Sequence, residues 1–145
     1  DSFARALKNE SNISVAPVIC YESIFGEYVS EYIKNGAQFI GIITNDGWWG
    51  NTQGHKQHFN YARLRAIEQR KSVARAANTG ISGFIDQKGI VLKESNYWVQ
   101  DALVQKIKIN SIQTFYTKHG DYIGLIALIL SPFLFIYSFF HKRYV

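Results

Sequence analysis

An uncharged stretch near the end of the sequence places the strongest constraint on what this chain can fold into. Residues 122–140 read YIGLIALILSPFLFIYSFF and carry no charged side chain. As a helix they would be about 28 Å long, close to the thickness of the hydrocarbon layer of a membrane. Tyr122 and Tyr137 stand near the two ends, where interfacial aromatic residues belong, and membrane helices tolerate a proline such as Pro132. A helix buried in a soluble core is the alternative, but the charged residues on both flanks favour a single membrane span.

This span divides the chain into two parts. Residues 1–118 form the domain, and residues 119–145 form the transmembrane helix with a short basic tail. Lys142 and Arg143 follow the span, and basic residues are retained on the cytoplasmic side of a membrane. The domain is therefore expected outside the cytoplasm, although Lys118 on the other flank weakens the charge bias.

Composition limits the partners and the extent of the chain. The formal charge is +5, but lysine and arginine are spread along the sequence without the basic run that nucleic-acid-binding arms show. No nucleic-acid partner is therefore expected. The chain contains no methionine and begins at Asp1, so we expect it to be a piece of a longer protein, large enough for about one domain.

Alternating strand and helix patterns predict an α/β domain. A short apolar run at 15–19 predicts a buried strand, and a second one is predicted at 37–44. Between them a helix is expected, ended by Asn35-Gly36, so the three elements form a parallel βαβ unit. The apolar face of this helix is formed by Phe25, Val29, Tyr32 and Ile33.

The patterns that follow predict a second helix and four more strands. The helix is expected over about 55–70, with an apolar stripe of Phe59, Ala62 and Ala66, and the residues 63, 65, 68, 70 and 71 on its wetter side. Strands are expected at 72–77, at 81–86 with 90–93 as a hairpin, and at 102–109 as a half-buried strand. The polar residues 1–12 are expected to be the tail of a helix followed by a linker.

Cys20 lies where the first strand meets the helix. It is the only cysteine, so its value lies in packing or in reactivity. The positive end of a helix dipole favours a thiolate, which makes Cys20 a candidate nucleophile. Position alone equally allows a small buried core residue, which is the commoner role of a free cysteine.

Two further groups of residues are candidates for a site. The second strand runs into the loop 45–51, NDGWWGN, and loops at strand ends are where α/β folds build their sites. His55 and His58 are spaced as a helical pair, but without a third ligand they do not predict a metal site. The arginines Arg63, Arg65 and Arg75 are interpreted as surface and packing residues.

Four motifs in order resemble one family. They are ICYES around Cys20, TNDGWWG at 44–50, QHFNYARLRAIEQ at 57–69 and RAANTGISGFID at 75–86. Together they resemble the second half of a carbon–nitrogen hydrolase (nitrilase-like) domain. The terminal apolar helix, preceded by TFYTKHGD at 114–121, narrows the resemblance to the apolipoprotein N-acyltransferase family. The implied fold is α/β: the C-terminal part of a nitrilase-like α-β-β-α sandwich, followed by one transmembrane helix.

The resemblance implies an activity, two substrates and a location. The family transfers an acyl chain from a phospholipid, through a thioester on the cysteine that matches Cys20, to the α-amino group of the diacylglyceryl-cysteine of an apolipoprotein. It uses no metal and no cofactor. It works in the bacterial inner membrane, as a multi-pass protein whose catalytic domain is periplasmic.

Further roles are implied by matching positions. The backbone N–H of Tyr21 is a natural oxyanion donor, and Glu22 either supports catalysis or orients neighbouring loops. Asn45 and Trp48 are expected to bind substrate, with an aromatic core role as the alternative for Trp48. Trp49 is expected to contribute to the site or to dip into the membrane interface.

The family's remaining catalytic groups are not matched in this chain. Its glutamate base and its oxyanion-stabilising lysine are expected upstream, because Lys8 and Glu10 lie too close to the Cys20 strand. Since triad members act as a unit, residues 1–145 alone are expected to be inactive. Two alternatives stay open: a membrane-tethered amidase of the same superfamily, and a catalytically dead, membrane-anchored binding module.

Overall fold

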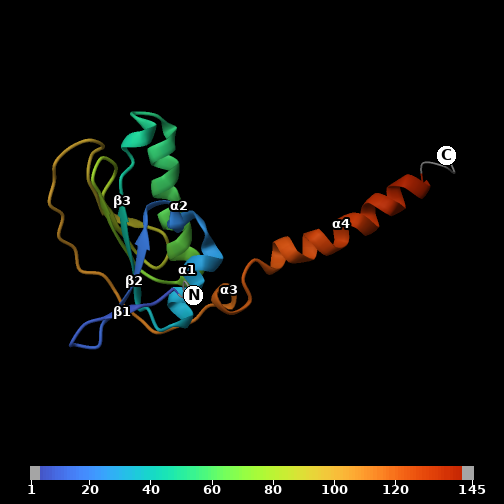
Figure 1. Cartoon of the computed structure of the whole chain (residues 1–145), viewed down its shortest axis with the longest axis horizontal. Helices are drawn as coiled ribbons and strands as arrows, with labels where there is room; N and C mark the ends of the chain where they lie inside the picture. Colours follow the sequence, from blue (N-terminus) through green and yellow to red (C-terminus); the bar gives the residue numbers. More distant parts are fainter. Residues whose placement is uncertain (1–3, 142–145) are drawn as a thin grey trace.

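A mixed sheet of six strands forms the body of the domain in the computed structural model, which describes residues 4–141 (Figure 1). The strands lie in sequence order: β1 (Leu7–Lys8), β2 (Ser14–Ile19), β3 (Phe39–Thr44), β4 (Val73–Ala77), β5 (Gly83–Ile85) and β6 (Val91–Glu94). The central strands β2, β3 and β4 are parallel, with Val15 opposite Phe39 and Ile40 opposite Val73. The outer pairs are antiparallel. The predicted βαβ unit and the predicted hairpin are therefore confirmed.

Helices α1 (Gly26–Lys34) and α2 (Gln53–Gln69) cover one face of this sheet. The short 3-10 helices η1 (Cys20–Ile24) and η2 (Gly47–Trp49) lie in the connections, and α3 (Phe115–His119) and α4 (Tyr122–His141) follow the sheet. Asn35 is the C-cap of helix α1, and Gly36 follows with φ +92°, as the Asn-Gly signal predicted. Thr52 is the N-cap of helix α2, and its hydroxyl accepts a hydrogen bond from the Gly54 N–H at 3.2 Å.

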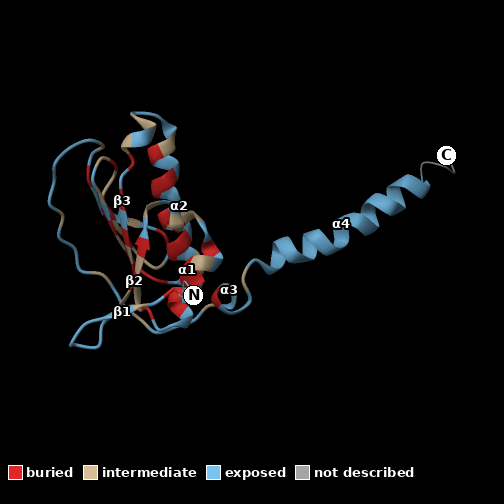
Figure 2. Cartoon of the chain, viewed as in Figure 1, coloured by how far each residue is buried: buried red, intermediate tan, exposed pale blue. Residues whose placement is uncertain are grey.

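The core lies between the sheet and these two helices (Figure 2). Because strand side chains alternate, every second residue points into it, such as Ala16 and Val18 on β2. The predicted stripe of α2, Phe59 with Ala62 and Ala66, is buried here as expected. The remaining strand and helix core residues include Ile40, Ile42, Val73, Ile85, Val29, Tyr32 and Ile33. Phe25 does not join them, because it precedes α1 as its N-cap and is exposed.

The other face of the sheet is apolar but largely uncovered. Its side chains come from the alternate positions of the same strands, and they line a groove of about 440 Å³. The groove includes Val15, Pro17, Gly41, Ala74 and Phe84, with Leu103 from the long segment after β6. The sheet is therefore a one-sided layer within this chain.

The predicted strand at 102–109 is wrong. That segment has no regular secondary structure. The carbonyl of Lys108 accepts from Ser72 Oγ at 2.7 Å and from Gln87 Nε2 at 3.3 Å, so side chains rather than a neighbouring strand satisfy this backbone. The predicted helix tail near the start is also wrong where it is described, since Leu7 and Lys8 form the edge strand β1.

Two of the residues assigned to the wetter side of α2 are buried, which corrects that prediction. Arg65 is buried because its guanidinium donates to the Ile24 carbonyl at 2.9 Å and pairs with Glu68. Lys71 is fully buried, and its Nζ donates to both the carbonyl and the side-chain oxygen of Asn110, each at 2.7 Å. Lys71 therefore ties the segment after β6 to the end of α2. Burial lowers the pKa of Lys71 to about 8.

Lys71 makes stability depend on pH in the alkaline range. Its pKa is about 8 in the folded protein and 10.5 ordinarily, so between these values the unfolded chain binds more protons. The free energy of unfolding should therefore rise from pH 8 toward pH 10, by up to about 3 kcal/mol over the full window. The neutral amine keeps two N–H donors for Asn110. Denaturant unfolding followed by tryptophan fluorescence measures the rise, and Lys71→Met should remove most of it. An equal rise in that variant would assign the effect to other groups.

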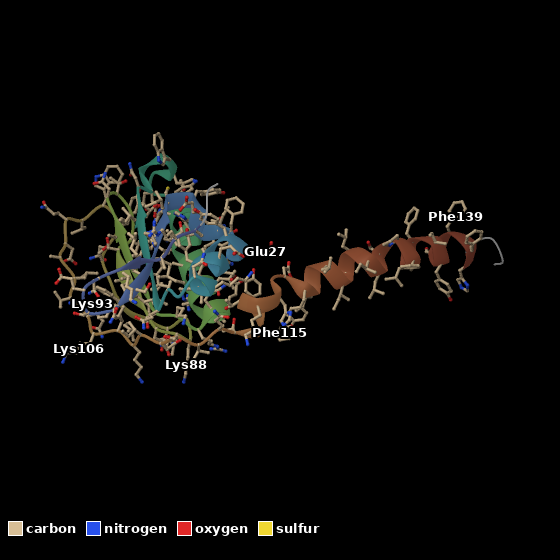
Figure 3. The ribbon with its side chains drawn as sticks, turned by 60° about the horizontal axis from the view of Figure 1, so that its bottom comes forward. Glu27, Lys88, Lys93, Lys106, Phe115 and Phe139 are labelled. Carbon is tan, nitrogen blue, oxygen red and sulfur yellow. The ribbon has the colours of Figure 1, made fainter. Side chains whose placement is uncertain are left out.

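Helix α4 is fully exposed over its whole length and projects from the domain (Figure 2). It is the one helix among residues 4–141 that is long and apolar enough to cross a membrane, about 30 Å at twenty residues. Lys142 and Arg143 lie outside the described residues. In Figure 3, Glu27 and Phe115 lie near the start of α4, whereas Lys93 and Lys106 lie at the opposite end of the domain.

Helix α3 holds the start of α4 against the domain. Thr114 Oγ1 donates to the Glu68 carbonyl at 2.6 Å, and Thr117 Oγ1 donates to Gln69 Oε1 at 2.7 Å. The Asp121 N–H donates to Glu27 Oε1 at 3.3 Å. The apolar helix therefore leaves the domain from a point anchored on both α1 and α2.

Candidate active site

Cys20 occupies a strained backbone position at the carboxyl end of β2. It is the first residue of η1, and its φ of +49° lies in the left-handed region that residues other than glycine rarely adopt. Such a conformation costs about 1–3 kcal/mol and persists only where its surroundings hold it. Ser23 Oγ donates to the Cys20 carbonyl at 2.8 Å, and His58 Nε2 lies 3.2 Å from the same oxygen. These contacts hold the sharp turn and leave the thiol half-buried at the strand end.

The thiol is met by a residue from the neighbouring strand. Thr44 ends β3, and its Oγ1 lies 3.3 Å from Cys20 Sγ. The same hydroxyl lies 3.0 Å from Oδ1 of Asp46, two residues further on. Because β2 and β3 are parallel, their carboxyl ends bring Cys20 and Thr44 to one edge of the sheet.

A buried charged cluster lies behind the cysteine. Asp46 is fully buried, accepts from Arg75 Nη2 at 2.7 Å through Oδ2, and lies 2.9 Å from His58 Nδ1 through Oδ1. Burial alone would raise the pKa of Asp46, but His58, Arg75 and Thr44 outweigh it and hold that pKa below its ordinary value. His58 Nδ1 has two neighbours: the Asp46 carboxylate, to which it can bond only by donating a hydrogen, and Arg75 Nη2 at 3.1 Å. Burial lowers the pKa of Arg75, and the charge of Asp46 opposes that effect.

The two helical histidines have separate partners. His58 bridges the cluster to η1, with Nε2 2.9 Å from Ser23 Oγ. His55 is stacked on Tyr97 with ring centroids 3.9 Å apart, and its Nδ1 lies 3.3 Å from the Gly50 carbonyl.

The interpretation of Arg75 as a packing residue is correct as to burial, but it overlooked the ion pair with Asp46.

Glu22 is held by the loop that carries the cysteine. Its Oε2 accepts from the Ile19 N–H at 2.8 Å, and its Oε1 accepts from the Tyr28 hydroxyl at 3.3 Å. Both oxygens thus brace η1 against the end of β2 and against α1. This is the contact pattern that a loop-orienting role requires.

Aromatic side chains form a rim beside Cys20. Tyr21 is half exposed and lies 5.9 Å from the His58 ring and 6.3 Å from the Trp49 ring, centroid to centroid. Trp48 is 83% exposed, which is incompatible with the aromatic-core alternative for it. Asn45 is exposed, and its Oδ1 accepts from the Gly47 N–H at 3.1 Å and from the Thr79 hydroxyl. The structure therefore brings Tyr21, Trp49 and His58 together, while Trp48 projects outward.

Sequence reasoning included Asp46 in the candidate loop 45–51 and weighed His58 as a metal ligand, but it assigned no place beside Cys20 to Thr44, Asp46, His58 or Arg75. A usable signal was present for Thr44 and Asp46, because the strand that Thr44 ends is paired with the Cys20 strand. No local signal placed His58 and Arg75 next to Asp46. Their roles depend on α2 and β4 converging on Asp46, and residues 46, 58 and 75 are far apart in sequence.

The fold and the site define a class of protein: an α/β domain with a single cysteine presented at the end of a parallel strand. Solved structures share the fold. The carbon–nitrogen hydrolase from Helicobacter pylori superimposes with a TM-score of 0.61 at 10% identity, over 69% of this chain and 42% of that one. An amidase from Nesterenkonia sp. gives a TM-score of 0.54 at 20% identity, over 67% and 38%.

The family follows from the sequence comparison. The model of the carbon-nitrogen hydrolase family matches residues 6–117, and the chain belongs to that family. It is 40% identical over 131 residues to the apolipoprotein N-acyltransferase of Chlorobaculum tepidum, covering 90% of this chain and 25% of that protein. It is 40% identical over 123 residues to the same enzyme of Haemophilus influenzae, covering 85% and 23%. The chain spans about a quarter of the length of these relatives.

Proposed function

We propose that this chain is the C-terminal part of an apolipoprotein N-acyltransferase, with Cys20 as the acyl-accepting nucleophile. The observation that carries the proposal is the 40% identity to the Chlorobaculum tepidum enzyme across 90% of the chain. The strained position of Cys20 and its contact with Thr44 agree with a presented, reactive thiol. In one Nesterenkonia amidase structure of the same fold, acrylamide has added to the active-site cysteine.

The reaction proceeds in two acyl transfers. First, the Cys20 thiolate attacks the ester carbonyl of a phospholipid, so a C–S bond forms and the ester C–O bond breaks. The lysophospholipid leaves as an alcohol after taking a proton. The α-amino group of a diacylglyceryl-cysteine then attacks the thioester, a C–N bond forms and the C–S bond breaks. The amine proton leaves with a base, and the thiolate is restored.

The described residues support these steps in distinct ways. The Tyr21 N–H is assigned to the oxyanion of the tetrahedral intermediates, and Glu22 keeps η1 in place through its bonds to Ile19 and Tyr28. Asn45 and Trp48 are assigned to substrate binding, since both are exposed on the loop after β3. A carboxylate base and an oxyanion-stabilising lysine are assigned to parts of the enzyme outside residues 1–145.

The uncovered sheet face fits the same proposal. In an α-β-β-α sandwich, two sheets pack face to face with helices outside. Helices α1 and α2 already form one outer layer here. We therefore assign the groove that includes Val15, Pro17 and Phe84 to contact with a second sheet from the rest of the enzyme.

The membrane topology is part of the proposal. Residues 1–118 are placed in the periplasm, and residues 119–145 as a span of a multi-pass inner-membrane protein, with Lys142 and Arg143 on the cytoplasmic side. The support is the exposed apolar helix α4 and the basic residues Lys142 and Arg143 that follow it in the sequence. Alkaline phosphatase fused to the C-terminus should be inactive, because it folds only outside the cytoplasm. Strong phosphatase activity would show that the orientation is the opposite one.

A labelling assay tests the proposed function. The purified full-length enzyme is incubated with phospholipid that carries a radiolabelled acyl chain, without acceptor. Hydroxylamine-sensitive label should appear on the protein, and adding a diacylglyceryl-lipopeptide with a free amine should move that label to the peptide. Ammonia release from small amides without acyl labelling would favour the amidase alternative. If neither acyl labelling nor ammonia release is detected, the remaining alternative is the catalytically dead binding module.

A further inference from the structure

Thr44 is placed so that its hydroxyl has two competing acceptors. Its side chain is buried, with Oγ1 3.3 Å from Cys20 Sγ and 3.0 Å from Asp46 Oδ1. A hydroxyl has one hydrogen to donate and two lone pairs to accept with. It can therefore donate to the sulfur or to the carboxylate, but not to both at once.

Asp46 does not depend on the Thr44 hydroxyl. Arg75 Nη2 donates to one of its oxygens at 2.7 Å, and the N–H of His58 lies 2.9 Å from the other. Asp46 thus keeps two charge-assisted partners when Thr44 turns away. The carboxylate is a fixed acceptor beside a hydroxyl that is free to rotate.

Charged groups approach Cys20 from every element packed around it: Glu22 from η1, Asp46 after β3, His58 from α2 and Arg75 from β4. Asp46 and Arg75 form an ion pair, so their effects on the sulfur oppose each other. The Glu22 carboxylate accepts from the Ile19 N–H and from Tyr28. Among residues 4–141, Thr44 is the group that lies within hydrogen-bonding distance of the sulfur itself.

We propose that Thr44 is a catalytic residue whose hydroxyl follows the ionisation of Cys20. While the thiol is protonated, S–H donates to Thr44 Oγ1 and Thr44 donates to Asp46. When the S–H bond breaks and its proton passes to a carboxylate base, the Thr44 hydroxyl rotates and donates to the thiolate. It returns to Asp46 once the sulfur has formed the thioester. Thr44 gains and loses no proton in this cycle. The inference rests on the proposed role of Cys20.

Two substitutions separate the effect of the Thr44 hydroxyl from the effect of its side-chain volume. Thr44→Val keeps the shape and removes the hydroxyl, whereas Thr44→Ser keeps the hydroxyl and removes a methyl group. Thr44→Ala is a second hydroxyl-free variant, to be read by the same criteria if the valine variant does not fold. The measurement is the rate of Cys20 alkylation by iodoacetamide in the full-length enzyme against pH, followed by mass spectrometry of the Cys20 peptide.

The alkylation rates of Thr44→Val and wild type, plotted against pH, are expected to cross. Without the hydroxyl the alkylation midpoint should move upward by about one pH unit, because a bond to the charged form is lost. A more basic thiolate is also more nucleophilic, by about threefold for that shift. Thr44→Val should therefore react about threefold slower than wild type at pH 7 and about threefold faster on the alkaline plateau. Thr44→Ser should follow the wild-type curve.

Two results overturn the proposal: an unmoved midpoint in the hydroxyl-free variants, or the same upward shift in Thr44→Ser. Alkylation needs no phospholipid, so this test is independent of acyl transfer. Acyl transfer by a Cys20→Ala enzyme would contradict the proposed function, whatever the alkylation rates are. If the wild type takes up acyl label and the Thr44 variants keep the wild-type alkylation midpoint, only the proposed role of Thr44 is contradicted.

Discussion

Replacing Cys20 by alanine is expected to abolish both the covalent acyl-enzyme and the acylated lipopeptide. In the proposed mechanism the Cys20 sulfur carries the acyl group, and no described neighbour can take its place: Thr44 is buried, and Ser23 is hydrogen-bonded to the Cys20 carbonyl. Cys20→Ser should be far slower, since a hydroxyl needs much stronger base assistance than a thiol. Full-length wild type and variants are incubated with labelled phospholipid, and hydroxylamine-sensitive label on the protein is compared.

The control separates loss of chemistry from loss of folding. Cys20→Ala changes the side-chain volume slightly and should cost at most about 1–2 kcal/mol of stability. Lys88→Ala should label like wild type, because Lys88 is exposed in the turn after β5, and β5 enters that turn beside Val73 at the amino end of β4, opposite the strand ends that carry the site. Equal labelling of Cys20→Ala and wild type would take Cys20 out of the mechanism, and the proposed function with it.

Breaking the Asp46–Arg75 pair is expected to give the largest loss of stability. Both side chains are fully buried and lie 2.7 Å apart, so Asp46→Asn leaves an unpaired guanidinium inside the domain. Removing one partner of such a pair costs about 3–5 kcal/mol, because the remaining charge stays desolvated. Denaturant unfolding of the full-length protein measures the loss. Asp46→Asn combined with Arg75→Met should be less damaging than the two single changes added together.

A surface ion pair serves as the matched control. Lys34 Nζ and Glu31 Oε1 are 2.8 Å apart but partly exposed on α1, and Lys34→Gln should change the free energy of unfolding by no more than about 0.5 kcal/mol. The Asp46 contribution also has a pH signature. Since its pKa is depressed below the ordinary 3.8, the stabilisation is present above pH 3.8 and is lost as the pH falls through the folded value. If Asp46→Asn lost as little stability as Lys34→Gln, the predicted contribution of the buried Asp46–Arg75 pair would be wrong.

The order of elements could be predicted from the sequence because local patterns determine it. The buried runs at 15–19 and 37–44, the Asn35-Gly36 stop and the hairpin turn all lie where they were expected. The apolar helix at the end was equally readable, since its length and lack of charge need no tertiary context. The strand predicted at 102–109 shows the limit: alternation of apolar residues predicts a strand only where another strand is available to pair with it.

Local sequence patterns account for the βαβ core, the position of Cys20 at a strand end, and a helix suited to a membrane. The surroundings of the thiol depend on long-range packing. Thr44 reaches it because two parallel strands end side by side, and Asp46, His58 and Arg75 meet because α2 and β4 converge behind it. Arg65 and Lys71, which a helix pattern assigns to water, are buried because Ile24 and Asn110 supply acceptors for them. A buried polar group is stable only with a partner, and that partner comes from a distant part of the chain, where no local pattern records it.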